Sequence, residues 1–338
     1  MELRPRRAGW TRRPYASRLT SSRPTVLVAR RLLPAGLDRL AAGCEIREGG
    51  LDANPKRLLE LAPGADAIVA DPAVTVDESL LDAAGPQLKV VANFAVGYDG
   101  IDLEACRRRG IPVTNTPDVL TNATAELALA LTLAAARRMS EAESDLRAGR
   151  WTGWDPAAYL GLELSGAVFA VVGLGRIGRR YAELVRALAG EILYVSRHEK
   201  EDAERELGAV RVSLDEALAR ADALSVHVPA SPDTAHLIGP AELAAMRPDA
   251  VIVNTSRGSV IDSIALAEAL RESSIGAAGL DVYEREPQVP AELLEAPRCV
   301  LLPHIGSATA RARDAMASLV ADNVLAALRG AEPPNRVA

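Results

Sequence analysis

The sequence predicts an α/β protein with two doubly wound domains of the Rossmann or flavodoxin kind, each with a parallel sheet, and a cleft between them. Three observations predict this fold. A chain of 338 residues suits about two domains. Strand-like and helix-like stretches alternate from Thr25 onward. A buried strand ends on a glycine-spaced turn in the middle of the chain, as dinucleotide-binding domains require.

Residues 1–23 are rich in Arg and Ser and hold a single acidic residue, Glu2. Pro5 and Pro14 would interrupt an amphipathic helix, so we expect a disordered basic extension rather than a transit-peptide-like leader. After it, apolar or β-branched runs predict short strands, and helical patterns separate several of them. The expected strands are Thr25–Ala29, Ala67–Ala70, Leu88–Asn93 and Pro112–Asn115, and the expected helices are Ala35–Ala42 and Pro55–Leu61.

A long helix rich in Ala and Leu is expected over Leu120–Arg138, followed by a second over Ser140–Ala148. The long helix either braces the hinge between the domains or packs on a partner subunit. The later strands read as buried on both faces. They are Val168–Val172, Ile192–Ser196, Ala223–Val228, Ala250–Thr255, Gly276–Val282 and Val300–Pro303.

The last expected helix, Ala308–Leu328, is long enough to reach back to the first domain. We therefore expect a discontinuous substrate-binding domain, residues 24–118 plus 309–338. Residues 119–308 would form the dinucleotide-binding domain between these two segments. Two chain crossings would then form a hinge over a cleft.

Composition excludes several classes of protein. A net charge of −6 gives no nucleic-acid footprint, and no apolar stretch reaches the length of a membrane span. The cysteines Cys44, Cys106 and Cys299 are scattered, which argues against a disulfide framework and a zinc site. We expect no metal, no nucleic acid and no membrane as partners, and a cytoplasmic location.

Gly173, Gly175 and Gly178 have the G-x-G-x-x-G spacing between the strand Val168–Val172 and a helix over Arg179–Leu188. The three glycines would provide a tight turn, close backbone approach to a pyrophosphate and close helix–strand packing. The helix N-terminus would face the anion. A glycine-rich turn without a ligand is the alternative, but the strand and helix on either side favour dinucleotide binding.

The strand Ile192–Ser196 ends in Ser196, Arg197 and His198, with no acid at its tip. An acid there binds the 2′-hydroxyl of NAD, whereas an Arg suits a 2′-phosphate. NADP(H) is therefore the preferred cofactor. NAD(H) stays open as the alternative because Glu199 and Asp202 lie nearby. Alternatively, Arg197 is a solvated surface charge that does not bind the cofactor.

Three later strand ends carry polar side chains. Arg257 follows one strand, Asp281 and Glu286 follow another, and His304 follows a third. Ligands bind at the carboxyl ends of strands in open α/β sheets. A histidine beside a carboxylate and an arginine can supply the proton that a reduced ketone needs. Alone, Arg257 could equally be structural.

Four stretches together resemble the D-2-hydroxyacid dehydrogenase family, and within it the glyoxylate/hydroxypyruvate reductase branch. They are Gly173–Gly178, Val251–Asp262, Gly279–Pro287 and Leu302–Thr309. The likeness runs from about Thr25 to Val337 and includes NFAVGYDGID at Asn93–Asp102 and TNTPDVLTNATAEL at Thr114–Leu127.

The resemblance implies that Arg257, Glu286 and His304 form the catalytic group. His304 would donate and accept the proton, Glu286 would be its partner, and Arg257 would anchor the substrate carboxylate and carbonyl. The backbone at Val96 and Gly97 would also bind the carboxylate. With the glycine turn, the expected cofactor contacts are Thr124, Gly173, Gly175, Arg176, Ile177, Gly178, Ser196, Arg197, His198, Val228, Pro229, Thr234, Thr255, Asp281 and Gly306, among which Asp281 would hold the nicotinamide carboxamide.

The resemblance thus implies NAD(P)H-dependent reduction of a small 2-oxo acid, glyoxylate or hydroxypyruvate, by a homodimer. Trp154 either borders the substrate pocket from the partner subunit or is an ordinary interface aromatic. Because the chain ends soon after Pro334, we expect no regulatory domain. A phosphoglycerate, D-lactate or phosphite dehydrogenase and a non-enzymatic NAD(H)-sensing corepressor are the alternatives. A formate dehydrogenase is less favoured, since that branch pairs its histidine with Gln rather than with a residue like Glu286.

Overall fold

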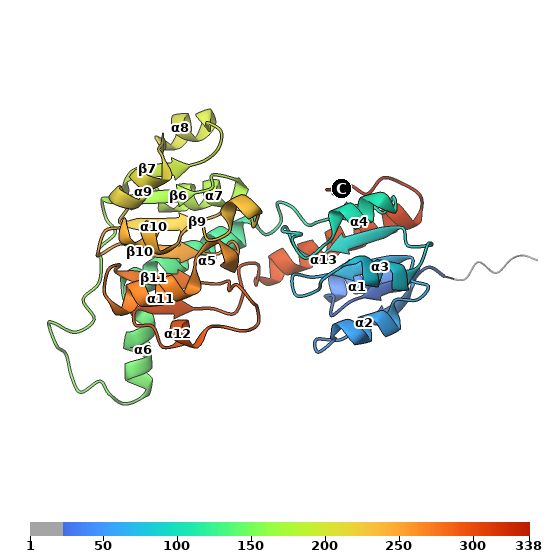
Figure 1. Ribbon diagram of the computed structural model, residues 1–338, viewed down its shortest axis with the longest axis horizontal. Coiled ribbons are helices and arrows are strands. Elements are labelled where there is room, and N and C mark those ends of the chain that lie inside the picture. The colour runs from blue at the N-terminus through green and yellow to red at the C-terminus, as the bar shows by residue number, and fades with distance from the viewer. Residues whose placement is uncertain (1–22) are drawn as a thin grey trace, which may run out of the picture.

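A computed structural model describes residues 23–338, which form two α/β domains, each built on a parallel sheet (Figure 1). The predicted fold class is confirmed. The predicted disordered extension, residues 1–23, lies outside the described residues except for Arg23. None of the helices within residues 23–338 combines the length and apolar character that a bilayer crossing requires. The cytoplasmic location stays a prediction.

The first domain has a five-stranded sheet in the order β2-β1-β3-β4-β5, a flavodoxin-like order, and all its paired strands are parallel. β1, β3 and β4 are buried at every position, because helices cover both faces. The strands are β1 Thr25–Val28, β2 Glu45–Glu48, β3 Ala67–Ala70, β4 Val90–Asn93 and β5 Val113–Thr114, and the helices are α1 Pro34–Ala41, α2 Pro55–Leu61, α3 Glu78–Ala84, α4 Leu103–Arg108 and, from the end of the chain, α13 Ala310–Leu328.

The second domain has a seven-stranded parallel sheet in the order β12-β11-β10-β9-β6-β7-β8. The strand order reverses between β6 and β9, where this class of fold binds its ligand. The strands are β6 Ala167–Val172, β7 Ala189–Val195, β8 Val210–Arg211, β9 Ala223–Val226, β10 Val251–Asn254, β11 Ala277–Leu280 and β12 Cys299–Leu301. The helices are α5 Thr121–Ala136, α6 Met139–Arg147, α7 Arg176–Val185, α8 Glu201–Leu207, α9 Leu214–Arg220, α10 Pro240–Ala244, α11 Ser263–Arg271 and α12 Ala291–Leu294, with short 3₁₀ turns at Pro232–Thr234 and Gly258–Val260.

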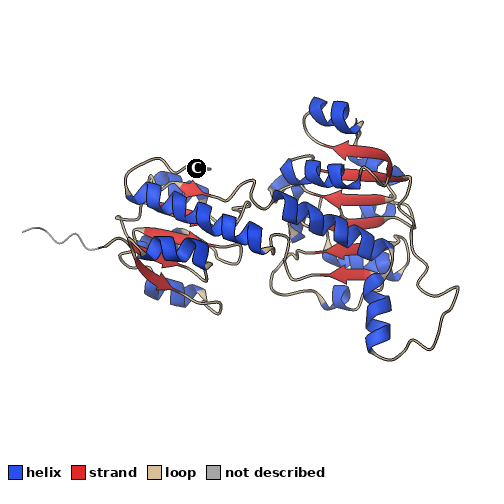
Figure 2. Ribbon diagram, turned by 180° about the vertical axis from the view of Figure 1, so that it is seen from behind, coloured by secondary structure: helices blue, strands red, loops and turns tan. Residues whose placement is uncertain are grey.

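The long final helix α13 packs on α1 and β4 of the first domain, and its first turn lies nearest the second domain (Figures 1 and 2). The end of the chain stays with the first domain, since the Val113 N–H donates to the Ala338 carbonyl oxygen. At the start of α5 and of α13, the buried side chains Leu120, Ala123, Ala312 and Met316 form a small apolar cluster. This cluster joins the two chain crossings. The exact domain bounds stay a prediction.

Candidate active site

The glycine turn lies at the point where the second sheet reverses its strand order. Gly173 has φ +98°, the left-handed region that favours glycine, and a methyl group on it would crowd the Val228 side chain from the end of β9. At Gly178 a methyl group would overlap the carbonyl oxygen of Gly173. At Gly175, by contrast, no atom lies within 4 Å of where the methyl group would stand. The turn thus leaves open space at the glycine where a pyrophosphate must approach.

Residues around this turn also fit a dinucleotide. Thr255, at the carboxyl end of β10, has a buried hydroxyl with no hydrogen-bond partner within residues 23–338. A buried polar atom without a partner is costly, so this hydroxyl suits a ligand. Arg176 and Ile177 begin α7 directly after the turn. The Arg176 guanidinium pairs with Asp118, 2.8 Å away at the chain crossing.

His304 and Glu286 are in direct contact: Nδ1 of the imidazole lies 2.6 Å from Oε2 of the carboxylate. The other carboxylate oxygen accepts a hydrogen bond of 3.0 Å from the Tyr283 N–H. Burial by itself would raise the pKa of Glu286. The hydrogen bond and the charge of His304 outweigh burial, with smaller contributions that include the charge of Arg257, so the pKa of Glu286 is lowered. The carboxylate is therefore held ionised beside the imidazole.

The loop that carries His304 is anchored by Asp281, a side chain only 1% exposed at the end of β11. The N–H groups of Ile305 and Gly306 each donate a 2.7 Å hydrogen bond to one of its carboxylate oxygens. Burial raises the pKa of Asp281, although these two N–H groups and the charge of His304 counteract part of the effect. A methyl group on Gly306 would contact both Asp281 and Thr124, so Thr124 of α5 borders the same point.

Arg257 reaches from the second domain to the first. Its Nε lies 2.9 and 3.0 Å from the two carboxylate oxygens of Asp99, and its Nη1 donates to the Ser256 carbonyl oxygen at 2.7 Å. A methyl group on Gly97 would overlap Nη2, so the guanidinium lies directly against the Val96–Gly97 turn. This turn needs glycine because a side chain there would displace Arg257.

Two side-chain amides bond the carbonyl oxygens of the Val96–Gly97 turn. Asn115 donates to the Val96 carbonyl oxygen at 2.9 Å and Asn93 to that of Gly97 at 2.6 Å. Neither the Val96 nor the Gly97 N–H donates to an acceptor within the described part of the chain. Both donors are therefore available beside the Arg257 guanidinium, a combination that suits a carboxylate.

The side predicted for adenosine is built from the ends of β7 and β9. Ser196, Arg197 and His198 follow β7, and the Arg197 and His198 side chains are exposed. Pro229 follows Val228, the residue beside the glycine turn. The Thr234 hydroxyl donates to the Pro229 carbonyl oxygen at 2.7 Å and accepts from the Ser231 N–H at 2.8 Å. Thr234 thus holds its own loop in shape.

Sequence reasoning missed four residues that position this site: Asn93, Asp99, Asn115 and Arg211. Asp99 lies two residues after Gly97 in the NFAVGYDGID stretch, and this proximity was the only signal that pointed to it. Arg211 ends β8, and its guanidinium donates to the carbonyl oxygens of Ser196 and Arg197. No motif marked it.

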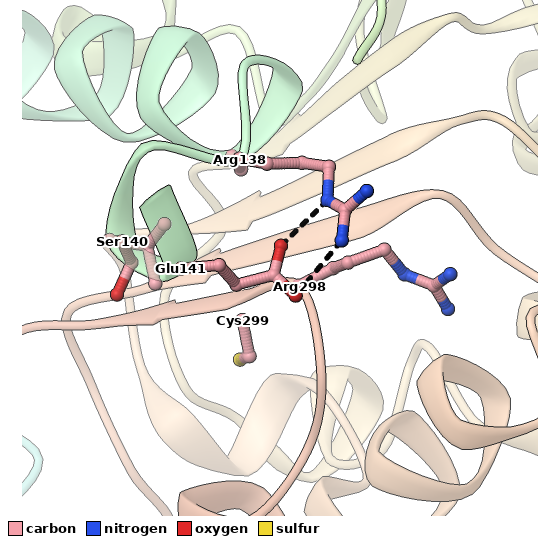
Figure 3. A pocket seen from close by; sticks show the side chains of 7 residues that line it. Arg138, Ser140, Glu141, Arg298 and Cys299 are labelled. Carbon is pink, nitrogen blue, oxygen red and sulfur yellow. Dashed lines mark hydrogen bonds and ion pairs between the residues drawn. The ribbon is translucent and has the colours of Figure 1, made fainter. Parts of the chain in front are cut away.

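A hollow elsewhere is lined by none of the predicted site residues. Figure 3 shows it where α5, α6 and β12 meet, with Arg138 bonded to Glu141 at 2.7 Å beside Arg298 and Cys299. Burial raises the pKa of the Cys299 thiol to about 12, so the thiol stays protonated and unreactive. The arrangement at this hollow is structural.

Comparison with known proteins agrees with this geometry. Residues 129–306 match the family model described as D-isomer specific 2-hydroxyacid dehydrogenase, NAD binding domain. Two similar relatives are glyoxylate reductases, each 45% identical across 93% of this chain: one from Thermococcus litoralis, with 97% of its length covered, and one from Aeropyrum pernix, with 96% covered.

Solved structures are equally similar. A crystal structure of a Thermus thermophilus protein superposes with a TM-score of 0.87 at 42% identity, with 93% of this chain and all of that one covered. A Sinorhizobium meliloti NADPH-dependent glyoxylate/hydroxypyruvate reductase, solved with NADP and malonate, gives 0.83 at 38% identity, with 94% and 97% covered. This chain therefore belongs to the D-isomer specific 2-hydroxyacid dehydrogenase family and is an NAD(P)-dependent oxidoreductase that acts on a small 2-oxo or 2-hydroxy acid.

Proposed function

We propose that this protein reduces glyoxylate or hydroxypyruvate to the corresponding 2-hydroxy acid, with NADPH as the preferred electron donor. The observation that carries the proposal is the contact of His304 with Glu286, near the Arg257 guanidinium that lies against the Val96–Gly97 turn. The Val96 and Gly97 N–H groups have no acceptor within residues 23–338. The names of the similar glyoxylate and glyoxylate/hydroxypyruvate reductases favour these substrates among 2-oxo acids.

Arg257 and the Val96–Gly97 turn would bind the substrate carboxylate. Asp99 and the Ser256 carbonyl oxygen already occupy Nε and one hydrogen of Nη1, which leaves Nη2 for a ligand. Nη2 is also the atom that lies against Gly97. A carboxylate between guanidinium and turn would receive charge-assisted hydrogen bonds from both domains at once, which orients the neighbouring carbonyl.

His304 would deliver the proton to the carbonyl oxygen. Because Nδ1 is bonded to Glu286, Nε2 is the ring nitrogen left to face the substrate. The contact with Glu286 fixes the orientation of the ring, and its protonated form would donate the proton. When bound, the nicotinamide supplies the hydride for the carbonyl carbon. Gly173, Gly175, Gly178 and Thr255 would hold the dinucleotide, with Thr124, Asp281 and Gly306 at its nicotinamide end.

The preference for NADPH is supported by the strand end at Ser196 and Arg197. No acidic residue stands at the tip of β7 to bind a 2′-hydroxyl. Arg197 is exposed and makes no ion pair within residues 23–338, so its guanidinium is free to meet a 2′-phosphate. NADH has only a neutral hydroxyl at that position, with no charge for the guanidinium to pair with.

One panel of assays tests both parts of the proposal. Oxidation of NADPH and of NADH by the full-length protein is followed with glyoxylate, hydroxypyruvate, pyruvate and phosphohydroxypyruvate. We expect the highest kcat/KM for NADPH with glyoxylate or hydroxypyruvate. A higher kcat/KM for pyruvate or phosphohydroxypyruvate would contradict the proposed substrate, and a preference for NADH would contradict the proposed cofactor.

We also propose that two copies of the chain associate through the segment around α6, which projects from the second domain (Figure 1). Large apolar side chains are exposed along it, including Leu146 (58%), Trp151 (58%) and Trp154 (84%). Exposed apolar patches of this kind mark protein interfaces. The mass measured by light scattering should be twice the 35.7 kDa of one chain. A monomer would contradict this assembly.

The predicted domain bounds are part of the same proposal. We propose that residues 24–118 and 309–338 form the substrate-binding domain and residues 119–308 the dinucleotide-binding domain. Support comes from α13, which packs on α1 and β4, and from the bond between Val113 and the last residue, Ala338. The test is whether a fragment of residues 119–308 folds and binds NADPH on its own. We expect it to do both, and a fragment that does neither would contradict the division.

A further inference from the structure

The loop that follows β7 is held by an arginine from the neighbouring strand. β8 pairs with β7 in parallel at the edge of the second sheet, with Arg211 opposite Tyr194. From there the Arg211 guanidinium turns onto the loop. Its Nε and Nη2 lie 3.2 and 3.0 Å from the Ser196 carbonyl oxygen, and Nη2 lies 2.9 Å from that of Arg197. A planar guanidinium can bond two successive carbonyl oxygens in this way, whereas an ammonium offers no such fork.

The far end of the same loop is fixed as well. The buried Tyr194 side chain comes from β7, and its hydroxyl donates to Glu204 at 2.6 Å and accepts from the Lys200 N–H at 2.9 Å. Arg211 therefore sets the beginning of the loop and Tyr194 its end. Residues 196–200 form a short loop whose backbone is held at both ends.

Between these anchors the loop presents donors without partners. Within residues 23–338, the Ser196 hydroxyl, the Arg197 guanidinium and the His198 ring make no side-chain hydrogen bond or ion pair. Arg211 adds a cation whose nearest acidic partner, Glu199, is 3.7 Å from its Nη1. A hydroxyl, a guanidinium and an imidazole on a fixed backbone match the oxygen atoms of a phosphate monoester.

We propose that Arg211 is a positioning residue that sets the selectivity of this enzyme for a dinucleotide with a 2′-phosphate. By fixing the Ser196 and Arg197 carbonyl groups, it orients the side chains of those residues before the cofactor arrives, and its charge favours a dianion over a hydroxyl. Pre-organised donors lose less conformational freedom on binding, which raises affinity for the group they fit. The inference rests on the proposed preference for NADPH and explains how the loop produces it.

The test compares Arg211→Ala and Arg211→Lys with the wild-type enzyme and a matched control, Arg205→Ala. Arg205 lies nearby on α8 and, within residues 23–338, pairs only with Asp202 and Glu206. The first readout is the ratio of kcat/KM for NADPH to that for NADH. The second needs no turnover: calorimetric affinities for 2′,5′-ADP and for 5′-AMP, which differ only in the 2′-phosphate, so that their ratio reports binding at the 2′ position alone.

We expect Arg211→Ala to lower both ratios by about ten-fold or more, mainly through weaker binding of the 2′-phosphate ligands, while the kcat/KM for NADH and the affinity for 5′-AMP change by less than about three-fold. Arg211→Lys should lower both ratios by an intermediate amount, because it keeps the charge and loses the fork. Arg205→Ala should leave both ratios as in the wild type.

Two other results would each overturn the inference, and they are distinguishable. A wild-type enzyme that favours 2′-phosphate ligands, with both ratios unchanged in Arg211→Ala and Arg211→Lys, would refute the role of Arg211 alone. A wild-type enzyme without any such preference would refute the proposed cofactor choice and this inference together. Should Arg211→Ala fail to fold, the Arg211→Lys ratios decide by the same criterion.

Discussion

Gly175 and Gly178 stand three residues apart in one turn, yet substitution by alanine should affect different properties. At Gly175 a methyl group meets open space, and the backbone there (φ −81°, ψ −163°) is one that alanine adopts. Gly175 also caps α7, where alanine is worse than glycine by some tenths of a kcal/mol, while a stiffer unfolded chain returns about 0.4–1 kcal/mol. We expect the free energy of unfolding of Gly175→Ala to stay within about 0.5 kcal/mol of the wild type.

The loss should appear in binding. A methyl group in the open space of the turn keeps a pyrophosphate from the backbone N–H groups. Losing one hydrogen bond to a charged group costs about 1.5–3 kcal/mol, which corresponds to roughly a 10- to 150-fold weaker Kd for NADPH. Titration of NADPH fluorescence measures this directly.

Gly178→Ala is the counterpart. A methyl group there overlaps the carbonyl oxygen of Gly173, a backbone atom that cannot rotate away. Overpacking costs about 1–3 kcal/mol, and the better helix propensity of alanine offsets at most about 1 kcal/mol. Thermal unfolding should therefore show a Tm several degrees lower for Gly178→Ala than for Gly175→Ala. Equal Tm values, or an unchanged NADPH Kd in Gly175→Ala, would refute the roles assigned to these glycines.

Four further outcomes follow from the site and the core. His304→Ala should lower kcat by about 10²- to 10⁴-fold while the NADPH Kd changes less than about two-fold, measured by turnover and titration; a loss of only a few-fold would contradict a proton donor. Arg257→Ala should raise the KM for glyoxylate by about ten-fold or more and also slow turnover, and unaltered kinetics would contradict its role. Glu286→Gln should lower kcat, because a neutral amide keeps the position of the carboxylate beside His304 but not its charge; an unchanged kcat would contradict the pairing. Burial lowers the pKa of His227 from 6.5 to about 3. Between these pH values the unfolded chain binds a proton that the folded protein does not. The free energy of unfolding therefore falls as pH drops from about 6.5 toward 3, by at most about 1.4 kcal/mol per pH unit. The free energy of unfolding, measured by chemical denaturation at pH 7 and pH 5, should depend less on pH in His227→Gln than in the wild type. Substitution of the exposed His198 by Gln should leave that dependence unchanged. The same pH dependence in both variants would contradict a neutral His227.

The fold was predictable because its central strands are buried on both faces and read as unbroken apolar runs. Ala67–Ala70 was predicted to the residue, and most other strands were predicted one or two residues too long at an end. Glu45–Glu48 was missed because it is an edge strand whose four residues are charged or half-exposed. Val210–Arg211 was missed because two residues carry no periodicity.

The glycine turn could be predicted in detail, since its spacing records the positive φ of Gly173 and the close packing of Gly178 on the Gly173 backbone. The contact of His304 with Glu286 was expected from the family resemblance, and the structure has it at 2.6 Å. Asp99 could not be found in the same way. It meets Arg257, which lies 158 residues further along the chain, only because two separate domains bring their strand ends together. The contact of Arg211 with the Arg197 carbonyl oxygen could not be predicted either, because it depends on the direction of a side chain, which the spacing of residues does not record.

The division of the site between two domains has a mechanical consequence. The Val96–Gly97 turn and Asp99 follow β4 of the first sheet, while Arg257, Glu286 and His304 follow strands of the second. A carboxylate held by the turn and by Arg257 would therefore stabilise one relative position of the domains. That position would place the substrate carbonyl within reach of His304, and release of the product would require it to relax. The chain crosses between the domains at the starts of α5 and α13, where a small apolar cluster packs instead of a continuous sheet or helix. Because few buried contacts resist motion there, we expect the two domains to move at these crossings, and substrate orientation to depend on how they close.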